Sequence, residues 1–195
     1  MEKQTSLTVP KLVERISEVS GLPLSKLKQL GRRLREGGHL SQHGHGRAGA
    51  AATSRDAGML LLVAMMTSTA VNTVINAEVI LKMRHPILDD NDDNLARLNF
   101  ESKDPLGVVV EMIDNLRRGT KKFPELTELR VMLDGSVLLV WGELFADFRP
   151  SENEKLMKRF EKVSDRRSNG DSPIKAMVSS EGWVLEPIAD WLEDR

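Results

Sequence analysis

The stretch TVPKLVERISEVSGLPLSKLKQLGRRLREGG, residues 8–38, carries the clearest structural pattern in the chain. Residues 8–20 predict a helix, because their apolar side chains recur at helical spacing. Pro10 suits an early helical position, and Thr8 is the expected cap. Gly21 follows the last periodic residue and is a good C-terminal stop.

A second helix is predicted from Ser25 to about Glu36, after a short Leu-Pro-Leu connection at 22–24. It has one apolar stripe and an opposite face that is strongly basic. Five of the ten residues from 26 to 35 are basic and none is acidic. The glycine pair that begins at Gly37 ends the helix.

A helix that stops at a glycine, a tight turn and a second helix with a basic face form the layout of a helix-turn-helix. The second helix of that motif lies in the DNA major groove, which is wide enough to admit it. The residues expected to face base edges are Ser25, Lys26, Gln29 and Arg33. The residues expected to reach phosphates are Lys28, Arg32 and Arg35.

Residues 39–53, HLSQHGHGRAGAAAT, predict a loop or a tight β-turn, because glycines alternate there with small and polar residues. Such a segment after the recognition helix fits the wing of a winged helix-turn-helix. Arg47 would contact a groove or a phosphate, with His43 and His45 as neutral donors. The glycines would let the backbone approach the sugar-phosphate closely.

Residues 8–50 resemble the winged helix-turn-helix segment of bacterial and bacteriophage DNA-binding proteins. The similarity rests on the Gly-Leu-Pro turn, the GRRLREGGHL ending and the basic glycine loop, and it covers about a quarter of the chain. It extends to small proteins of bacteriophages and prophages. The resemblance implies DNA binding and does not indicate a particular promoter or pathway.

The apolar segment 54–84 predicts a buried helix that begins near Ala57, is capped by Ser54 or Asp56, and breaks near 67–69. A strand is an alternative for residues 71–80, which are rich in β-branched side chains. The apolar run is too short to cross a bilayer. The segment 85–105, which is acidic and rich in asparagine, predicts a linker or an exposed loop.

The C-terminal half predicts a helix over 106–118 and then a β-hairpin. Its strands, 126–133 and 136–145, are joined by Asp134-Gly135, a strong hairpin signal. Further expected elements are a charged helix over 151–168, short strands at 174–178 and 183–185, and a helical end over 187–195.

The expected fold is therefore α+β, with an N-terminal winged helix-turn-helix followed by a small C-terminal α+β unit that contains a β-hairpin. Residues 1–84 would form the DNA-binding domain with its long apolar helix, and 85–105 the acidic linker. Residues 106–195 would form a dimerisation or partner-binding domain.

The formal net charge of −1 averages over unlike segments. Residues 1–58 carry +5 and residues 59–84 carry +1, whereas residues 85–115 carry −6 and residues 116–195 carry −1. Charge asymmetry of this kind points to a partner that is contacted by one segment. The basic excess lies where the resemblance to DNA-binding proteins lies.

Several functional classes lack support in the sequence. The chain has no cysteine, which excludes disulfides and thiolate metal sites. No phosphate-binding loop, nucleophile elbow or dinucleotide fingerprint is present, so neither an enzyme nor a cofactor is expected. His39, His43, His45 and Asp56 lack the spacing of a known metal motif. The acidic cluster that begins at Asp89 lacks the pattern of a calcium loop.

The sequence thus predicts a sequence-specific double-stranded DNA-binding protein, a bacterial or phage transcriptional regulator located in the cytoplasm. Paired half-sites favour a homodimer, and the C-terminal part is available for a protein partner. One alternative is a phage DNA-packaging subunit that recognises its genome. Another is an inhibitor or adaptor without DNA binding, in which the methionine-rich run 59–66 would suit an adaptable interface.

Overall fold

The computed structural model describes residues 8–42, 51–66, 70–84, 100–102, 104–119, 128–131, 136–141, 144–149 and 185–193. Its helices are α1 (Val9–Ser20), α2 (Leu24–Glu36), α3 (Ser54–Met66), the 3-10 turn η1 (Ala70–Asn72), α4 (Thr73–Lys82), α6 (Pro105–Arg117) and α8 (Leu185–Glu193). Its strands are β1 (Glu128–Val131), β2 (Val137–Trp141) and β3 (Leu144–Phe148).

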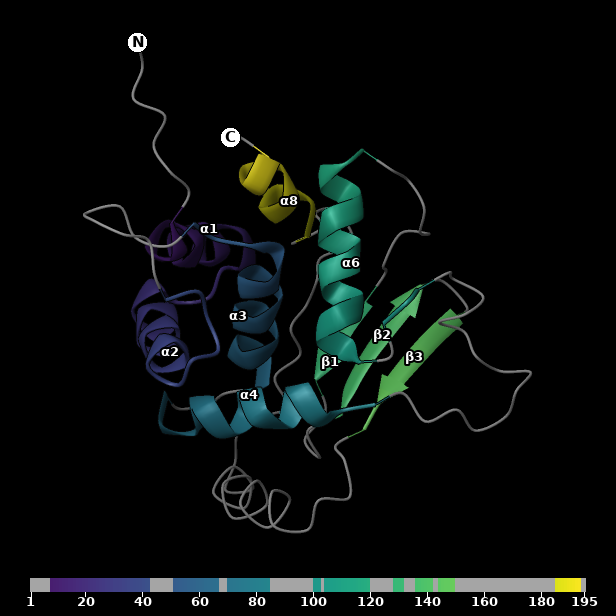
Figure 1. Ribbon diagram of the computed structural model, residues 1–195, viewed down its shortest axis with the longest axis horizontal. Helices are drawn as coiled ribbons and strands as arrows, with labels where there is room; N and C mark the ends of the chain where they lie inside the picture. The colour runs from purple at the N-terminus through teal and green to yellow at the C-terminus, as the bar shows by residue number, and fades with distance from the viewer. Residues whose placement is uncertain are drawn as a thin grey trace.

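Helix α3 occupies the centre of the molecule. Helices α1 and α2 lie on one side of it, α6 and the small sheet lie on the other, and α4 runs beneath (Figure 1). Helix α8 packs against α6, α1 and α3. The architecture is therefore mixed helical with a small antiparallel sheet, in agreement with the predicted α+β class.

The first helix pair follows its sequence signals closely. The backbone of Gly21 has a φ of 69°, a left-handed conformation that favours glycine, and its N–H donates to the Ser17 carbonyl at 3.0 Å. Thr8 stands at the N-cap but makes no side-chain capping hydrogen bond. Its backbone instead forms a bridge with Ala51.

Helix α2 begins at Leu24, one residue before the predicted start, and ends before the predicted glycine pair. At its C-terminal end the N–H of Gly37 donates to the Arg33 carbonyl at 2.9 Å. The N–H of His39 donates to the Leu34 carbonyl at 2.8 Å. These bonds satisfy carbonyls that the end of the helix would leave unpaired.

Helix α3 carries only apolar residues and one glycine from Ala57 onward, and every one of its residues except Arg55 is buried. It begins earlier than predicted, and neither Ser54 nor Asp56 precedes it as a cap. The cap is Thr53, whose hydroxyl accepts from the Asp56 N–H at 3.1 Å while the Asp56 carboxylate accepts from the Thr53 N–H at 2.9 Å. This reciprocal pair is a capping box.

The apolar segment divides close to the predicted break, since α3 ends at Met66 and η1 begins at Ala70; residues 67–69 lie outside the described residues. The alternative of a strand over 71–80 is wrong, because these residues form η1 and α4. Val79 and Ile80 are fully buried, so tertiary packing outweighs their β propensity.

Helix α6 begins at Pro105, and the Asp104 carboxylate caps it by accepting from the Gly107 N–H at 2.9 Å. Strands β1, β2 and β3 form an antiparallel sheet in that order. The β1–β2 pair is the predicted hairpin, with Val131 opposite Val137. Its predicted turn residues, Asp134-Gly135, lie outside the described residues.

The second predicted strand, 136–145, is wrong as a single element. It contains β2 and the start of β3, which pair with each other up to Trp141 and Leu144. Only Gly142-Glu143 stands between those two residues. A glycine followed by a polar residue between apolar runs is a signal for a two-residue hairpin loop.

The C-terminal helix α8 confirms the predicted helical end, with Ile188 and Leu192 fully buried. It begins at Leu185, which the sequence placed in a short strand over 183–185. The expected helix over 151–168 and strand over 174–178 lie outside the described residues.

One hydrophobic cluster includes buried residues from both predicted parts of the chain, from Leu12 in α1 to Leu192 in α8. Helix α3 packs against α6, and α1 packs against α8. The division into units at 1–84 and 106–195 stays a prediction about function. No helix among the described residues is long and apolar enough to span a membrane.

Candidate nucleic-acid interface

The basic helix α2 is anchored by a continuous buried face formed by Leu27, Leu30, Gly31 and Leu34. A Cβ atom at position 31 would lie 3.0 Å from the Val13 Cγ2 atom. The glycine therefore lets α2 approach α1 closely. The packing of this face fixes which residues of α2 point into solvent.

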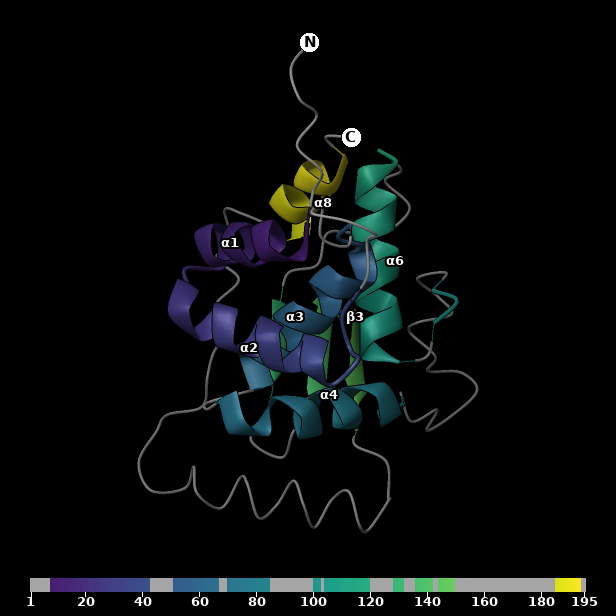
Figure 2. The same ribbon diagram turned by 60° about the vertical axis from the view of Figure 1, so that its left-hand side comes forward.

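Six of the seven residues predicted on α2 are exposed to solvent. They are Ser25, Lys28, Gln29, Arg32, Arg33 and Arg35. Their shared exposure follows from the apolar stripe, because residues three and four apart lie on one side of a helix. The predicted basic face is thus one surface of the molecule, and Figure 2 shows α2 across the front of α3.

Lys26 differs from the other predicted residues. It is half-buried, and its Nζ atom donates to the carbonyl of Ala64, near the C-terminal end of α3, at 3.5 Å. A cation at this position satisfies a carbonyl close to the negative end of the helix dipole. Lys26 therefore contacts α3, whereas the other cations predicted on α2 are exposed to solvent.

Within the exposed face, four residues form the line that points most directly outward. Successive residues of a helix are rotated by about 100°, which places Ser25, Gln29, Arg32 and Glu36 opposite the buried stripe. Arg33 lies on one flank of this outward line and Lys28 with Arg35 on the other. The Arg32 side chain is 74% exposed, more than those of Lys28 and Arg33, the other cations of α2 in ion pairs between described residues.

Two carboxylates lower the positive charge of this surface. The Arg32 Nε atom lies 2.7 Å from Glu36 Oε1, and the Arg33 Nη1 atom lies 3.7 Å from Glu36 Oε2. The Lys28 Nζ atom lies 3.5 Å from Glu14 Oε1 on α1. Both carboxylates lie outside the basic window 26–35, so the charge pattern of that window does not indicate them. The four-residue spacing of Arg32 and Glu36 is the signal that indicates their pairing.

The pKa values of the Arg32–Glu36 pair shift in the directions that favour the ionised forms. The side-chain hydrogen bond from Arg32 lowers the pKa of Glu36 below its ordinary value. The same hydrogen bond raises the pKa of Arg32. Both side chains are exposed to solvent, so the pair weakens as salt concentration rises.

The glycine-rich segment that follows α2 is fixed at both of its ends by the buried Asp56. The Asp56 carboxylate accepts from the Ser41 N–H at 2.8 Å and from the Ser41 hydroxyl at 2.9 Å. It also accepts from the Thr53 N–H at 2.9 Å and the Thr53 hydroxyl at 2.7 Å. The motif Thr-x-x-Asp at 53–56 is the sequence signal for part of this arrangement.

Two further contacts hold the same ends beside the helix pair. The Gln42 side-chain amide donates to the Arg35 carbonyl on α2, and Ala51 bridges Thr8 before α1. The predicted contacts His43, His45 and Arg47 lie outside the described residues. Among the residues that the structure describes, no group of three potential metal ligands is close enough to hold an ion.

Searches of protein-family models, curated proteins and solved structures found no match to the chain.

Proposed function

We propose that the chain binds double-stranded DNA in a sequence-specific manner through α2 and acts as a transcriptional regulator. The observation that carries the proposal is the solvent-exposed face of α2. Lys28, Gln29, Arg32, Arg33 and Arg35 all project there from a helix whose other side is locked into the core.

The chemistry of this face suits the major groove. Arginine and lysine neutralise phosphates, arginine pairs with the O6 and N7 atoms of guanine, and glutamine pairs with adenine. Helix α2 has 13 residues, which at 1.5 Å each gives a length of about 20 Å. An exposed helix of this length is suitable for the groove.

The fixed ends of the glycine-rich segment support the winged form of the proposal. Ser41 and Thr53 are joined through Asp56, and Gln42 contacts the last turns of α2. Residues 42 and 51, which flank in sequence the segment that carries Arg47, are therefore held at α2 and at the start of α1, respectively. We propose that Arg47, His43 and His45 act there, and that a homodimer with paired half-sites supplies specificity.

The test is the salt dependence of DNA binding by the full chain, measured by fluorescence anisotropy on random and genomic duplexes. Release of counterions from phosphates requires affinity to fall steeply as salt rises. A K28A/R33A/R35A variant should weaken binding at least tenfold and reduce the slope of log K against log salt by about 2 to 3.

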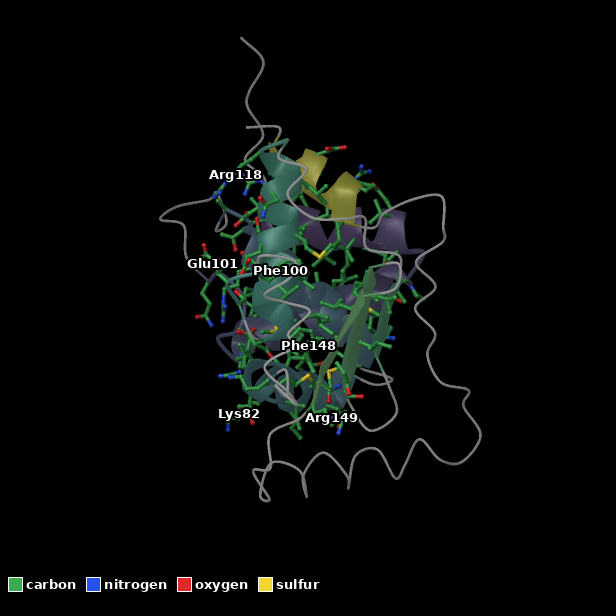
Figure 3. All side chains as sticks on the ribbon, turned by 90° about the vertical axis from the view of Figure 1, so that its right-hand side faces the viewer. Lys82, Phe100, Glu101, Arg118, Phe148 and Arg149 are labelled. Atoms are coloured by element: carbon green, nitrogen blue, oxygen red, sulfur yellow. The ribbon has the colours of Figure 1, made fainter. Side chains whose placement is uncertain are left out.

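The matched control is K82A/R118A/R149A, which removes three exposed cations from the ends of α4, α6 and β3 (Figure 3). It changes the net charge by the same amount and should leave the slope within about one unit. Equal losses of DNA affinity in both variants would mean that the overall net charge, and not the exposed surface of α2, determines binding. No binding at low salt would overturn the proposal in favour of a protein-interaction module.

A further inference from the structure

The Arg32–Glu36 pair lies on the outward line of α2, where a binding partner would meet it first. A carboxylate at this position repels phosphate, so it weakens a surface whose only role is to hold the DNA backbone. Its contact with Arg32 therefore calls for a second explanation. The geometry of that contact supplies one.

Glu36 holds Arg32 through a single edge of the guanidinium. Its Oε1 atom accepts from the Arg32 Nε atom at 2.7 Å. Within the part of the chain that the structure describes, the two terminal nitrogens of Arg32 have no hydrogen-bond partner. Four of the five N–H donors of the group thus remain available, while the hydrogen bond at Nε restrains the orientation of its plane.

The orientation of a guanidinium matters far more for binding to a base than for binding to a phosphate. A phosphate accepts a cation from many directions, whereas the O6 and N7 atoms of guanine accept two parallel hydrogen bonds from one planar group. An arginine that is already oriented loses less conformational entropy when it makes these bonds. A carboxylate that accepts a hydrogen bond from an arginine orients that side chain. Carboxylates that accept hydrogen bonds from metal-binding histidines orient those ligands in the same way.

We propose that Arg32 reads a guanine in the major groove and that Glu36 is the residue that positions it. This inference rests on the proposed DNA binding through α2. It replaces the expectation that Arg32 contacts phosphate. It also assigns Glu36 a double effect, since its charge lowers affinity for every duplex while its hydrogen bond raises the preference for guanine at one position.

The experiment first selects a preferred duplex for the full chain from a random library. Binding is then measured to that duplex and to an unrelated one, and to versions in which each guanine in turn is replaced by 7-deazaguanine, which lacks the N7 acceptor. Wild type should show one guanine whose replacement weakens binding about tenfold. R32A should lose this penalty, while the distal variant K82A/R118A/R149A should keep it.

The Glu36 variants separate orientation from charge. E36A should bind the unrelated duplex several-fold more tightly. The loss of affinity that 7-deazaguanine causes should be severalfold smaller in E36A than in wild type. E36Q keeps a side-chain oxygen that accepts from Nε, so it should gain affinity and retain most of the penalty. All these side chains are exposed, and circular dichroism checks that the variants remain folded.

The outcomes distinguish the inference from the function on which it rests. If wild type binds no duplex, both are overturned. If the K28A/R33A/R35A variant loses binding but E36A leaves the guanine penalty unchanged, DNA binding stands and the positioning role of Glu36 is overturned. If R32A retains the penalty, Arg32 does not read the base.

Discussion

At the scale of single residues, the charges on α2 depend on neighbours that a sequence window does not contain. The basic residues from 26 to 35 were correctly predicted to share an exposed face, with the exception of Lys26, which contacts the Ala64 carbonyl. The exposed pattern follows from local periodicity alone. The contacts of Lys26 with α3 and of Lys28 with Glu14 depend on tertiary packing, which periodicity does not describe.

The pair of Arg32 and Glu36 leads to a prediction about pH. The pKa of Glu36 is lowered chiefly by its hydrogen bond to Arg32. The contribution of this pair to stability is therefore present above the ordinary pKa of a glutamate and is lost as pH falls through the lowered value. In R32A, the pKa of Glu36 should rise toward its ordinary value. An NMR titration of the Glu36 side-chain carboxyl carbon measures this change.

The conservative variant R32K serves as the control for that titration. Lysine keeps the charge but lacks the Nε donor that the present geometry uses, so the pKa of Glu36 should lie between those of wild type and R32A. An unchanged pKa in R32A would show that the hydrogen bond between these side chains is not maintained in solution.

At the scale of elements, the helices were easier to predict than the sheet. Gly21 and Pro105 mark a helix end and a helix start where the structure has them. The strand over 136–145 was wrong because its apolar residues belong to two strands, β2 and β3, which pair with each other. A prediction based on apolar runs alone joins the residues on both sides of a glycine into one strand, unless the glycine is treated as a turn signal.

The close contact between α1 and α2 provides a prediction for an element pair. A Cβ atom at position 31 would meet Val13 Cγ2 at 3.0 Å, so the larger side chain of G31V overpacks the contact between the two helices. We expect it to lower the free energy of unfolding by about 2 kcal/mol, a typical cost of overpacking. Urea denaturation followed by circular dichroism measures this value.

Removal of the facing methyl groups tests whether that contact is the cause. In the V13A background, G31V should cost clearly less than in wild type, which a double-mutant cycle detects as coupling between the two sites. If the effects of the two substitutions on the free energy of unfolding are additive, the contact between residue 31 and Val13 is not the source of the strain.

A large loss of DNA affinity in G31V at temperatures where it remains folded would show that the position of α2 matters for binding.

At the scale of the whole molecule, the sequence predicted two units separated by an acidic linker, whereas the described residues share one core. The linker prediction rested on composition, and composition does not reveal which apolar faces meet. Phe100, at the end of the predicted linker, is buried in the same cluster as Leu30 of α2 and Ile113 of α6. Long-range packing of this kind has no local signal in the chain.

A shared core predicts cooperative unfolding of the whole chain. We expect one transition in urea, with the same midpoint by circular dichroism and by tryptophan fluorescence.

Two substitutions, L30A and I113A, test this cooperativity. Leu30 and Ile113 lie on opposite sides of the predicted linker, and both side chains are fully buried. Each should lower the free energy of unfolding by about 2 to 5 kcal/mol and shift this same transition. If each variant moved only one of two transitions, the parts would be independent folding units. If the single transition holds, a ligand bound to the C-terminal part would stabilise α2 as well, because any ligand that binds only the folded state stabilises the entire cooperative unit.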